Sequence, residues 1–245
     1  ADHGRFPYAW LTPIVAETWD GYLNDIDGFH VADTHAIEAL EAARAGPIAE
    51  GNVGGGTGMI TYEFKGGTGT ASRRVTQSGE THTVGVLVQA NHGIRPWLNV
   101  LGAPVGSHLT KGRLWSQEQG SIIVVAATDA PLQPIQLKRL ARRIAIGIGR
   151  TGTPSGDNSG DIFLAFSTAN GEAATGRAAV RQMRFLANEV LDPFFLAVVE
   201  ATEEAIVNAM IAAKDMSGLN GHRALAIDHG ELVAVMGRYG RMKRR

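Results

Sequence analysis

Apolar and polar residues recur along the chain with two periods, which divide it into predicted helices and strands. Apolar positions at helical spacing predict helices over residues 34–45, 132–147, 177–190, 192–214 and 230–239. Short apolar or alternating runs predict strands over residues 59–65, 73–77, 82–90, 121–127 and 161–168. The runs at 121–127 and 161–168 are apolar on both faces, so we expect these two strands to be covered on two sides.

The grouping of these elements predicts an α+β fold. Short glycine-containing connections between the strands of residues 59–90 favour antiparallel pairing, and helices lie between and after the strand groups. The glycine-rich run at 50–58 is too short to link two domains. Because 245 residues are enough for one large hydrophobic core, we expect a single domain over residues 1–245.

Composition and charge exclude several classes of protein. Lys and Arg number 23 against 24 Asp and Glu, so no strong field attracts nucleic acid. The basic residues of the 132–147 helix share one face without interleaved aromatics, which favours a solvated helix face. No apolar run reaches the roughly 18 residues that span a bilayer. We therefore expect no nucleic-acid or membrane partner and a cytoplasmic location, with the periplasm as the alternative if a signal was removed.

The motifs of three large enzyme classes are absent. The sequence has no Gly-x-Ser-x-Gly elbow, no Gly-x-x-x-x-Gly-Lys-Ser/Thr phosphate loop and no His-Glu-x-x-His zinc motif. It contains no cysteine, and its eight histidines lack metal-ligand spacing. The glycine run Gly54–Gly58 precedes a predicted strand rather than a helix, so it is a poor nucleotide cradle. We expect neither a metal nor an organic cofactor.

The most informative segment is Asp157-Asn158-Ser159-Gly160-Asp161, where a glycine-rich loop becomes a buried strand. A serine hydroxyl fixed at a strand start can attack the carbonyl of the preceding residue, here Asn158. Cleavage between Asn158 and Ser159 would leave an α-amine with a pKa of about 7.7–8.0, a built-in general base for the same hydroxyl. On spacing alone, an ordinary Asn-Ser-Gly turn before a strand is the favoured interpretation.

Five segments resemble the L-aminopeptidase/D-amino-acid esterase and β-peptidyl aminopeptidase family, and they occur in order over nearly the whole chain. They are residues 17–21, 50–59, 84–91, 159–170 and 202–204. The resemblance implies an αββα sandwich of two mainly antiparallel sheets covered by helices, similar to ornithine acetyltransferases. It also implies self-cleavage into residues 1–158 and 159–245, and a homo-oligomer of such processed pairs. Members of the family have a longer stretch ahead of residues 17–21, and the chain departs from them there.

The resemblance also suggests roles for single residues. Ser159 is the nucleophile, and Asn158 supplies the carbonyl that is cleaved. Asn91, at the end of a predicted strand, and Tyr62, after the glycine loop, are the oxyanion-hole candidates. Each of these two is equally explained as a structural hydrogen-bonding residue. Substrate-binding positions are expected in the glycine loop, which contributes Gly55, Gly56 and Thr57.

A carboxylate is expected to hold the α-ammonium of the nucleophile or substrate, and periodicity favours Glu203 for this role. On the 192–214 helix, Glu203 falls on the flank of an apolar stripe, whereas Glu200 and Glu204 point away from it. A carboxylate near a buried face is costly unless it is paired. An ordinary glutamate at the helix edge is the alternative. The family has a serine shortly before this glutamate, and Ala201 is a departure from it.

Together the residues and what the resemblance implies predict a self-processing serine aminopeptidase that releases N-terminal residues from small peptides, amides or esters through an acyl-enzyme on Ser159. One alternative is an acyltransferase on the same scaffold, although that branch uses threonine as the nucleophile. A second alternative is an uncleaved, inactive binding or structural protein. An intact Asn158–Ser159 bond together with no turnover would favour this last alternative.

Overall fold

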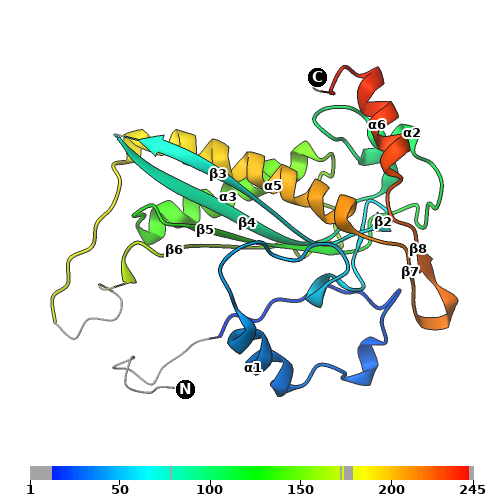
Figure 1. Cartoon of the computed structure of the whole chain (residues 1–245), viewed down its shortest axis with the longest axis horizontal. Coiled ribbons are helices and arrows are strands. Elements are labelled where there is room, and N and C mark those ends of the chain that lie inside the picture. Colours follow the sequence, from blue (N-terminus) through cyan, green and yellow to red (C-terminus); the bar gives the residue numbers. More distant parts are fainter. Residues whose placement is uncertain (1–12, 78, 172, 174–178, 243–245) are drawn as a thin grey trace.

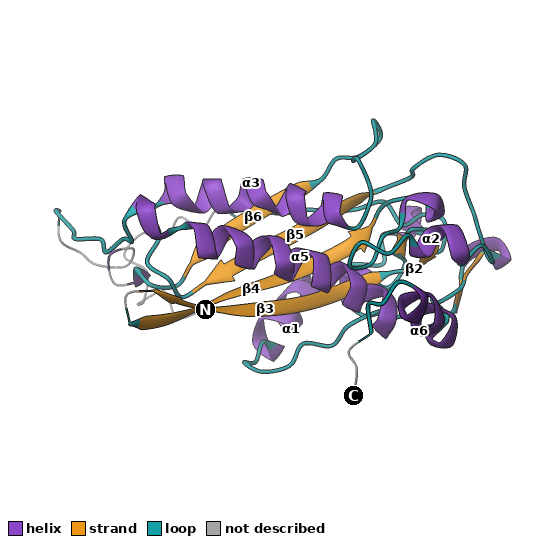
Figure 2. Ribbon diagram, turned by 90° about the horizontal axis from the view of Figure 1, so that it is seen from above, coloured by secondary structure: helices purple, strands orange, loops and turns teal. Residues whose placement is uncertain are grey.

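The computed structural model describes residues 13–77, 79–171, 173 and 179–242. Its main sheet has four strands in the order β3 (Gly67–Gln77), β4 (Glu80–Asn91), β5 (Ser121–Thr128) and β6 (Ile162–Ser167). The first two pairings are antiparallel, and β5 and β6 run parallel. Helices α3 (Pro134–Arg150) and α5 (Asp192–Ala212) cover one face of this sheet (Figures 1 and 2).

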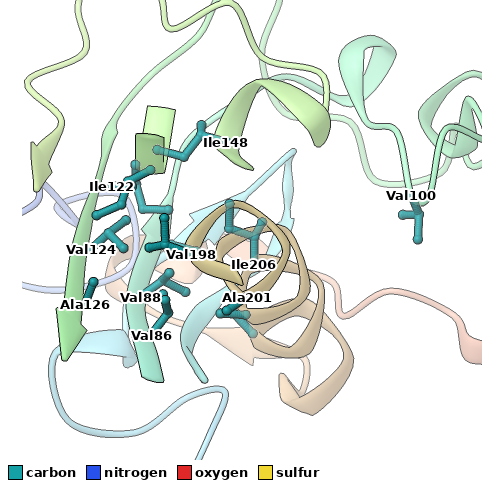
Figure 3. Close-up of a cluster of buried hydrophobic side chains, with 14 of the residues drawn as sticks. Val86, Val88, Val100, Ile122, Val124, Ala126, Ile148, Val198, Ala201 and Ile206 are labelled. Atoms are coloured by element: carbon teal, nitrogen blue, oxygen red, sulfur yellow. The ribbon is translucent and has the colours of Figure 1, made fainter. Parts of the chain in front are cut away.

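The hydrophobic core lies between this sheet and the two helices. Alternate residues of β4 and β5 point towards the helices and are buried, as period-two strands require. Figure 3 shows Val88 and Val124 on the strands close to Val198 on α5. Helix α5 packs closely against β3 and α3 because Gly69 of β3 and Gly147 of α3 have no side chains. A Cβ atom at either glycine would clash with the α5 backbone.

The opposite face of the sheet is apolar but only partly covered in the described residues. Val125 and Ala127 of β5 are half-buried, and Phe166 of β6 is 42% exposed. The segment at 46–48 borders this face and forms a pocket with it of about 460 Å³. The expectation that residues 121–127 and 161–168 are covered on both sides is therefore not met within the part of the chain that the structure describes.

Smaller elements surround the main sheet. The remaining described helices are α1 (Asp33–Ala42), α2 (Val105–His108) and α6 (His229–Arg238), and short 3-10 turns lie at Ile26–Gly28, Gly54–Gly56, Arg95–Trp97, Asn188–Val190 and Leu219–Gly221. Two hairpins complete the set: β1 (Ile60–Thr61) with β2 (Phe64–Lys65), and β7 (Met216–Ser217) with β8 (Arg223–Ala224). None of the described helices combines the length and the apolar composition that a membrane span requires.

The α+β class and four of the five predicted helices are confirmed, with ends that shift by a few residues. The single strand predicted over 59–65 is wrong, because Tyr62 and Glu63 both adopt positive φ (52° and 61°) and turn the chain into a tight hairpin. The helix predicted over 177–190 is also wrong. Residues 177–178 lie outside the described residues, and 179–187 are non-helical, held partly by a hydrogen bond from Leu186 N to Pro131 O at 2.9 Å.

Candidate active site

Ser159 lies in the loop that joins α3 to the edge strand β6. The loop makes a tight turn in which the Ser159 amide donates to the Gly156 carbonyl at 2.9 Å. Asn158, inside the turn, is exposed, and Ser159 is half-buried. On the other side of Ser159, the Gly160 amide donates to the Ser121 hydroxyl at the start of β5 at 2.8 Å. The peptide bond between Asn158 and Ser159 is thus accessible and fixed on both sides.

The hydroxyl of Ser159 has a carboxylate partner two residues further along the chain. It donates a hydrogen bond to Asp161 Oδ1, and a carboxylate oxygen is the acceptor of such a bond. The second oxygen of Asp161 accepts from the Ser155 hydroxyl at 2.9 Å, and Oδ1 also accepts from the Ile122 amide at 3.2 Å. These bonds orient the carboxylate so that the Ser159 proton points at it.

A second carboxylate, that of Glu118, holds the loop in place through three hydrogen bonds. Its side chain is buried, and Oε1 accepts from the Gly93 amide at 2.7 Å and from the Thr153 hydroxyl at 3.0 Å. Its Oε2 accepts from the Gly156 amide at 2.6 Å. Glu118 therefore ties the end of β4 to the first residue of the turn that contains Asn158. Nothing in the sequence singles it out, because it stands alone in a polar loop and its partners are distant along the chain.

Tyr62 supports the same loop. The Thr151 hydroxyl donates to the Ile148 carbonyl at 2.6 Å, so the Tyr62 hydroxyl donates to Thr151 Oγ1 at 2.7 Å. The Tyr62 oxygen accepts from the Thr153 amide at 3.2 Å. Burial raises the pKa of Tyr62 well above its usual range, and its hydrogen bonds with Thr151 and Thr153 oppose this shift. In this conformation the Tyr62 hydroxyl donates its one proton to Thr151 Oγ1. An oxyanion role for Tyr62 stays a prediction.

Asn91 lies at the same end of the sheet as Ser159. It is the last residue of β4 and pairs with Ser121 of β5, whose hydroxyl holds Gly160. Its amide accepts from Ile60 N at 2.8 Å and donates to Trp19 O at 2.7 Å. The amide is thus engaged with two other segments. These bonds are the structural role that was the alternative for Asn91, and its oxyanion role stays a prediction.

The predicted substrate-binding positions Gly55, Gly56 and Thr57 form one short turn beside the main sheet. The Thr57 hydroxyl donates to Gly54 O at 2.7 Å, and a side chain at Gly55 would press against Gln89 of β4. By register, Gln89 is in the row of Ile123 and Ile162, near the strand ends that carry the Ser159 loop. The glycine turn and the Ser159 loop are therefore at the same end of the sheet.

A buried lysine that the sequence did not single out holds the glycine turn. Lys65 is fully buried, and its ammonium donates to the carbonyls of Gly56, Met59 and Gly66 at 3.1, 2.7 and 2.9 Å. Burial lowers its pKa to about 7, and the nearby Asp20 carboxylate opposes this shift. Lys65 therefore fixes the backbone of the turn at the cost of a buried charge.

Glu203 is buried on α5, as predicted, while Glu200 and Glu204 are more exposed and pair with Arg73. Its carboxylate forms an ion pair with Arg150 Nε at 2.7 Å. Arg150 is the last residue of α3 and directly precedes the Ser159 loop. These charged residues line a pocket of about 440 Å³ to which Ser159 does not contribute. Glu203 is thus connected to the loop through Arg150 and has no hydrogen bond to Ser159 among the described contacts.

His92, next to Asn91, is a further buried group near the loop. Neither ring nitrogen has a hydrogen-bond partner among the described residues, and the ring packs edge-on against Tyr62 with centroids 5.2 Å apart. Burial lowers the pKa of His92 to about 4, and the Asp161 carboxylate opposes this shift. His92 is therefore neutral at pH 7. No group of three or more metal-ligating side chains occurs in residues 13–77, 79–171, 173 and 179–242.

Known proteins resemble the chain in both sequence and structure. It is 50% identical to a β-peptidyl aminopeptidase, BapA, of Sphingosinicella microcystinivorans, over 97% of this chain and 64% of that protein. The L-aminopeptidase D-Ala-esterase/amidase of Ochrobactrum anthropi superposes with a TM-score of 0.91 at 56% identity, covering 96% of this chain and 65% of that one. A Burkholderia sp. β-aminopeptidase gives a TM-score of 0.89 at 45% identity, covering 100% and 68%.

These likenesses decide the fold and the family. The Ochrobactrum protein is described as a prototype for the serine aminopeptidases and a new variant among the Ntn hydrolase fold, which confirms the predicted sandwich class. The chain spans less than two thirds of the length of the curated β-peptidyl aminopeptidases it matches. The model of peptidase family S58 matches residues 4–224. With a serine fixed in an accessible loop and relatives of this identity, the chain belongs to peptidase family S58.

Proposed function

We propose that this protein is a self-processing aminopeptidase in which Ser159 is the nucleophile. Cleavage between Asn158 and Ser159 produces a new N-terminus, and the mature enzyme releases N-terminal residues from small peptides, amides or esters. The observation that carries the proposal is the environment of Ser159. Its hydroxyl donates a hydrogen bond to the Asp161 carboxylate, and the peptide bond before it lies in an accessible turn. The names of the relatives support the same reaction class.

The proposed reaction needs protein groups alone. After processing, the α-amine of Ser159 takes the proton of its own hydroxyl, and the Oγ attacks the carbonyl of the substrate's first residue. The leaving amine takes up that proton as the acyl-enzyme forms. A water molecule then attacks the ester while the α-amine accepts a proton from it, and the α-amine returns that proton to Ser159 Oγ as the free amino acid leaves.

Glu203 is the proposed partner of a substrate ammonium. It is a buried carboxylate, and its present partner is the Arg150 guanidinium. Binding of an ammonium therefore requires exchange of this ion pair for the substrate. Because Arg150 adjoins the Ser159 loop, that exchange would couple substrate binding to the loop.

The activity is tested with short peptides and amino-acid anilides on the purified protein. We expect the wild type to release the N-terminal residue and Ser159→Ala to lose at least about 1,000-fold in kcat/KM, because the covalent route is removed. Ser116→Ala, at an exposed serine outside the loop, is the matched control and should keep full activity. Equal activity of Ser159→Ala and the wild type would refute the assignment.

The proposed assembly is a homo-oligomer of processed pairs. The half-exposed apolar face formed by β5 and β6 gives the protein a surface that favours association. Light scattering coupled to size-exclusion chromatography is expected to give a mass of two or more processed pairs. A mass equal to one pair across the accessible concentration range would contradict this part of the proposal.

A further inference from the structure

We propose that Asp161 is the general base that starts self-cleavage, an inference that rests on the proposed processing at Asn158–Ser159. The α-amine that serves the mature enzyme does not exist before cleavage, because that nitrogen is still part of the peptide bond. The first proton must therefore go to another group. Asp161 is the carboxylate that receives the hydrogen bond of the Ser159 hydroxyl in the uncut chain.

The geometry around Asp161 suits proton transfer. Three donors, the Ser159 hydroxyl, the Ser155 hydroxyl and the Ile122 amide, converge on its two oxygens. The Ser155 and Ile122 bonds hold the carboxylate in place, while the Ser159 bond defines the path of the proton. A base within hydrogen-bonding distance of the proton is the first requirement of general base catalysis.

The peptide bond to be cleaved is also restrained. The Gly156 amide donates a hydrogen bond to Glu118, and the Gly156 carbonyl accepts one from the Ser159 amide. The Gly160 amide donates a hydrogen bond to the Ser121 hydroxyl. These bonds keep the residues on both sides of Asn158 in position while Asn158 itself stays exposed. The attacking oxygen and the target carbonyl belong to adjacent residues, so a small rotation within the turn brings them together.

Other ionisable groups near Asp161 are less suited to the task. Glu118 already accepts three hydrogen bonds, none of them from Ser159. Glu203 is paired with Arg150. Tyr62 is kept protonated by burial, which raises its pKa. His92 is buried and neutral, with no hydrogen bond to Ser159 in the described part of the chain. Asp161 is thus the one described acceptor in direct contact with the hydroxyl.

Self-cleavage moves one proton through Asp161 in two stages. Asp161 accepts the hydroxyl proton while Ser159 Oγ bonds to the carbonyl carbon of Asn158, forming a tetrahedral intermediate. Asp161 then returns the proton to the Ser159 nitrogen as the carbon–nitrogen bond breaks. The products are an ester between Asn158 and Ser159 Oγ, a free α-amine and an ionised Asp161. Water hydrolyses the ester and leaves a carboxylate on Asn158.

The test measures the rate at which a new N-terminus at Ser159 forms, as a function of pH, in the full chain. A carboxylate base predicts a wild-type rate that is constant from about pH 6 to pH 9. In Asp161→Asn the rate should fall by about 100-fold or more. The residual reaction should rise about tenfold per pH unit, because hydroxide replaces the missing base. Asp161→Glu, which keeps the carboxylate, should be slower than the wild type but retain the constant profile.

Controls separate catalysis from structure and from the proposed function. Ser155→Ala removes a donor to Asp161 but not the base, so its profile should also stay constant. An Asp161→Asn rate equal to the wild type, or a slower rate with a constant profile, would overturn the inference while the proposed function stands. A wild-type rate that itself rises with hydroxide would overturn it without any variant. If the wild type forms no N-terminus at Ser159, the proposed processing fails, and the inference fails with it.

Discussion

Glu118→Gln tests the claim that a buried carboxylate sets the conformation of the Ser159 loop. The substitution keeps the shape of the side chain but replaces one acceptor oxygen with an NH2 group. If that group takes the place of Oε2, it faces the Gly156 amide, and two donors oppose each other. The bonds from Gly93 and Thr153 remain, but they lose the charge of the acceptor.

The magnitude follows from these three bonds. A hydrogen bond to a charged group contributes about 1.5–3 kcal/mol and a neutral one about 1 kcal/mol. Losing the Gly156 bond and weakening the other two therefore removes about 4 kcal/mol. Relief from burying a charge offsets part of this loss. We expect the free energy of unfolding to fall by about 2–3 kcal/mol.

The assay is urea unfolding followed by circular dichroism, with every variant in a Ser159→Ala background so that the chain stays uncut. Glu38→Gln, at an exposed glutamate of α1, is the matched control and should change the free energy of unfolding by less than about 0.5 kcal/mol. Amide hydrogen exchange should speed up at Gly93 and Gly156 in Glu118→Gln. A free-energy change equal to that of Glu38→Gln, with unchanged exchange at both amides, would show that Glu118 does not set the conformation of the loop.

Three further predictions concern groups around the site. Lys65 has a lowered pKa of about 7 in the folded state. Between about pH 7 and pH 10 the unfolded chain therefore binds more protons than the folded chain, and the free energy of unfolding should rise with pH by up to about 4 kcal/mol. In Lys65→Met this rise, measured by urea unfolding at each pH, should disappear. An equal rise in both proteins would contradict the prediction. Tyr62→Phe leaves the Thr153 amide unpaired and should cost about 1–2 kcal/mol in the same unfolding assay, with no loss counting against the network. Arg150→Met frees Glu203 for a substrate ammonium, so the KM for peptides should fall in this variant. Glu203→Gln should raise the KM about tenfold or more. Steady-state kinetics in which both variants match the wild type would show that Glu203 does not bind the substrate.

The fold could be predicted wherever one period dominates the sequence. Helices α3, α5 and α6 and strands β4, β5 and β6 have clear apolar patterns and form close to the expected positions. Strand β3 instead begins at Gly67, six residues before the strand predicted over 73–77. The segment at 179–187 shows where this reasoning fails. Its composition suits a helix, but Gln136 Nε2 donates to Leu186 O at 2.8 Å and Arg184 N donates to Asn170 Oδ1 at 3.0 Å, and such tertiary bonds outweigh helix propensity.

The sequence led to Ser159 through the family resemblance, because spacing alone favoured an ordinary turn, and its role as nucleophile stays a prediction. The residues that support the Ser159 loop could not be predicted. Glu118 and Lys65 act on backbone groups that are distant along the sequence, so no local motif reveals them. The Tyr62 turn was missed because two consecutive non-glycine residues at positive φ are rare.

N-terminal sequencing of the purified protein, with its intact mass under denaturing conditions, shows whether the Asn158–Ser159 bond is cleaved. We expect a second N-terminus that reads Ser159-Gly160-Asp161 in the wild type and is absent from Ser159→Ala. A wild-type chain whose Asn158–Ser159 bond stays intact while it hydrolyses peptides at full rate would contradict the proposed mechanism. The α-amine of Ser159, which is the proposed base for peptide hydrolysis, would then never form.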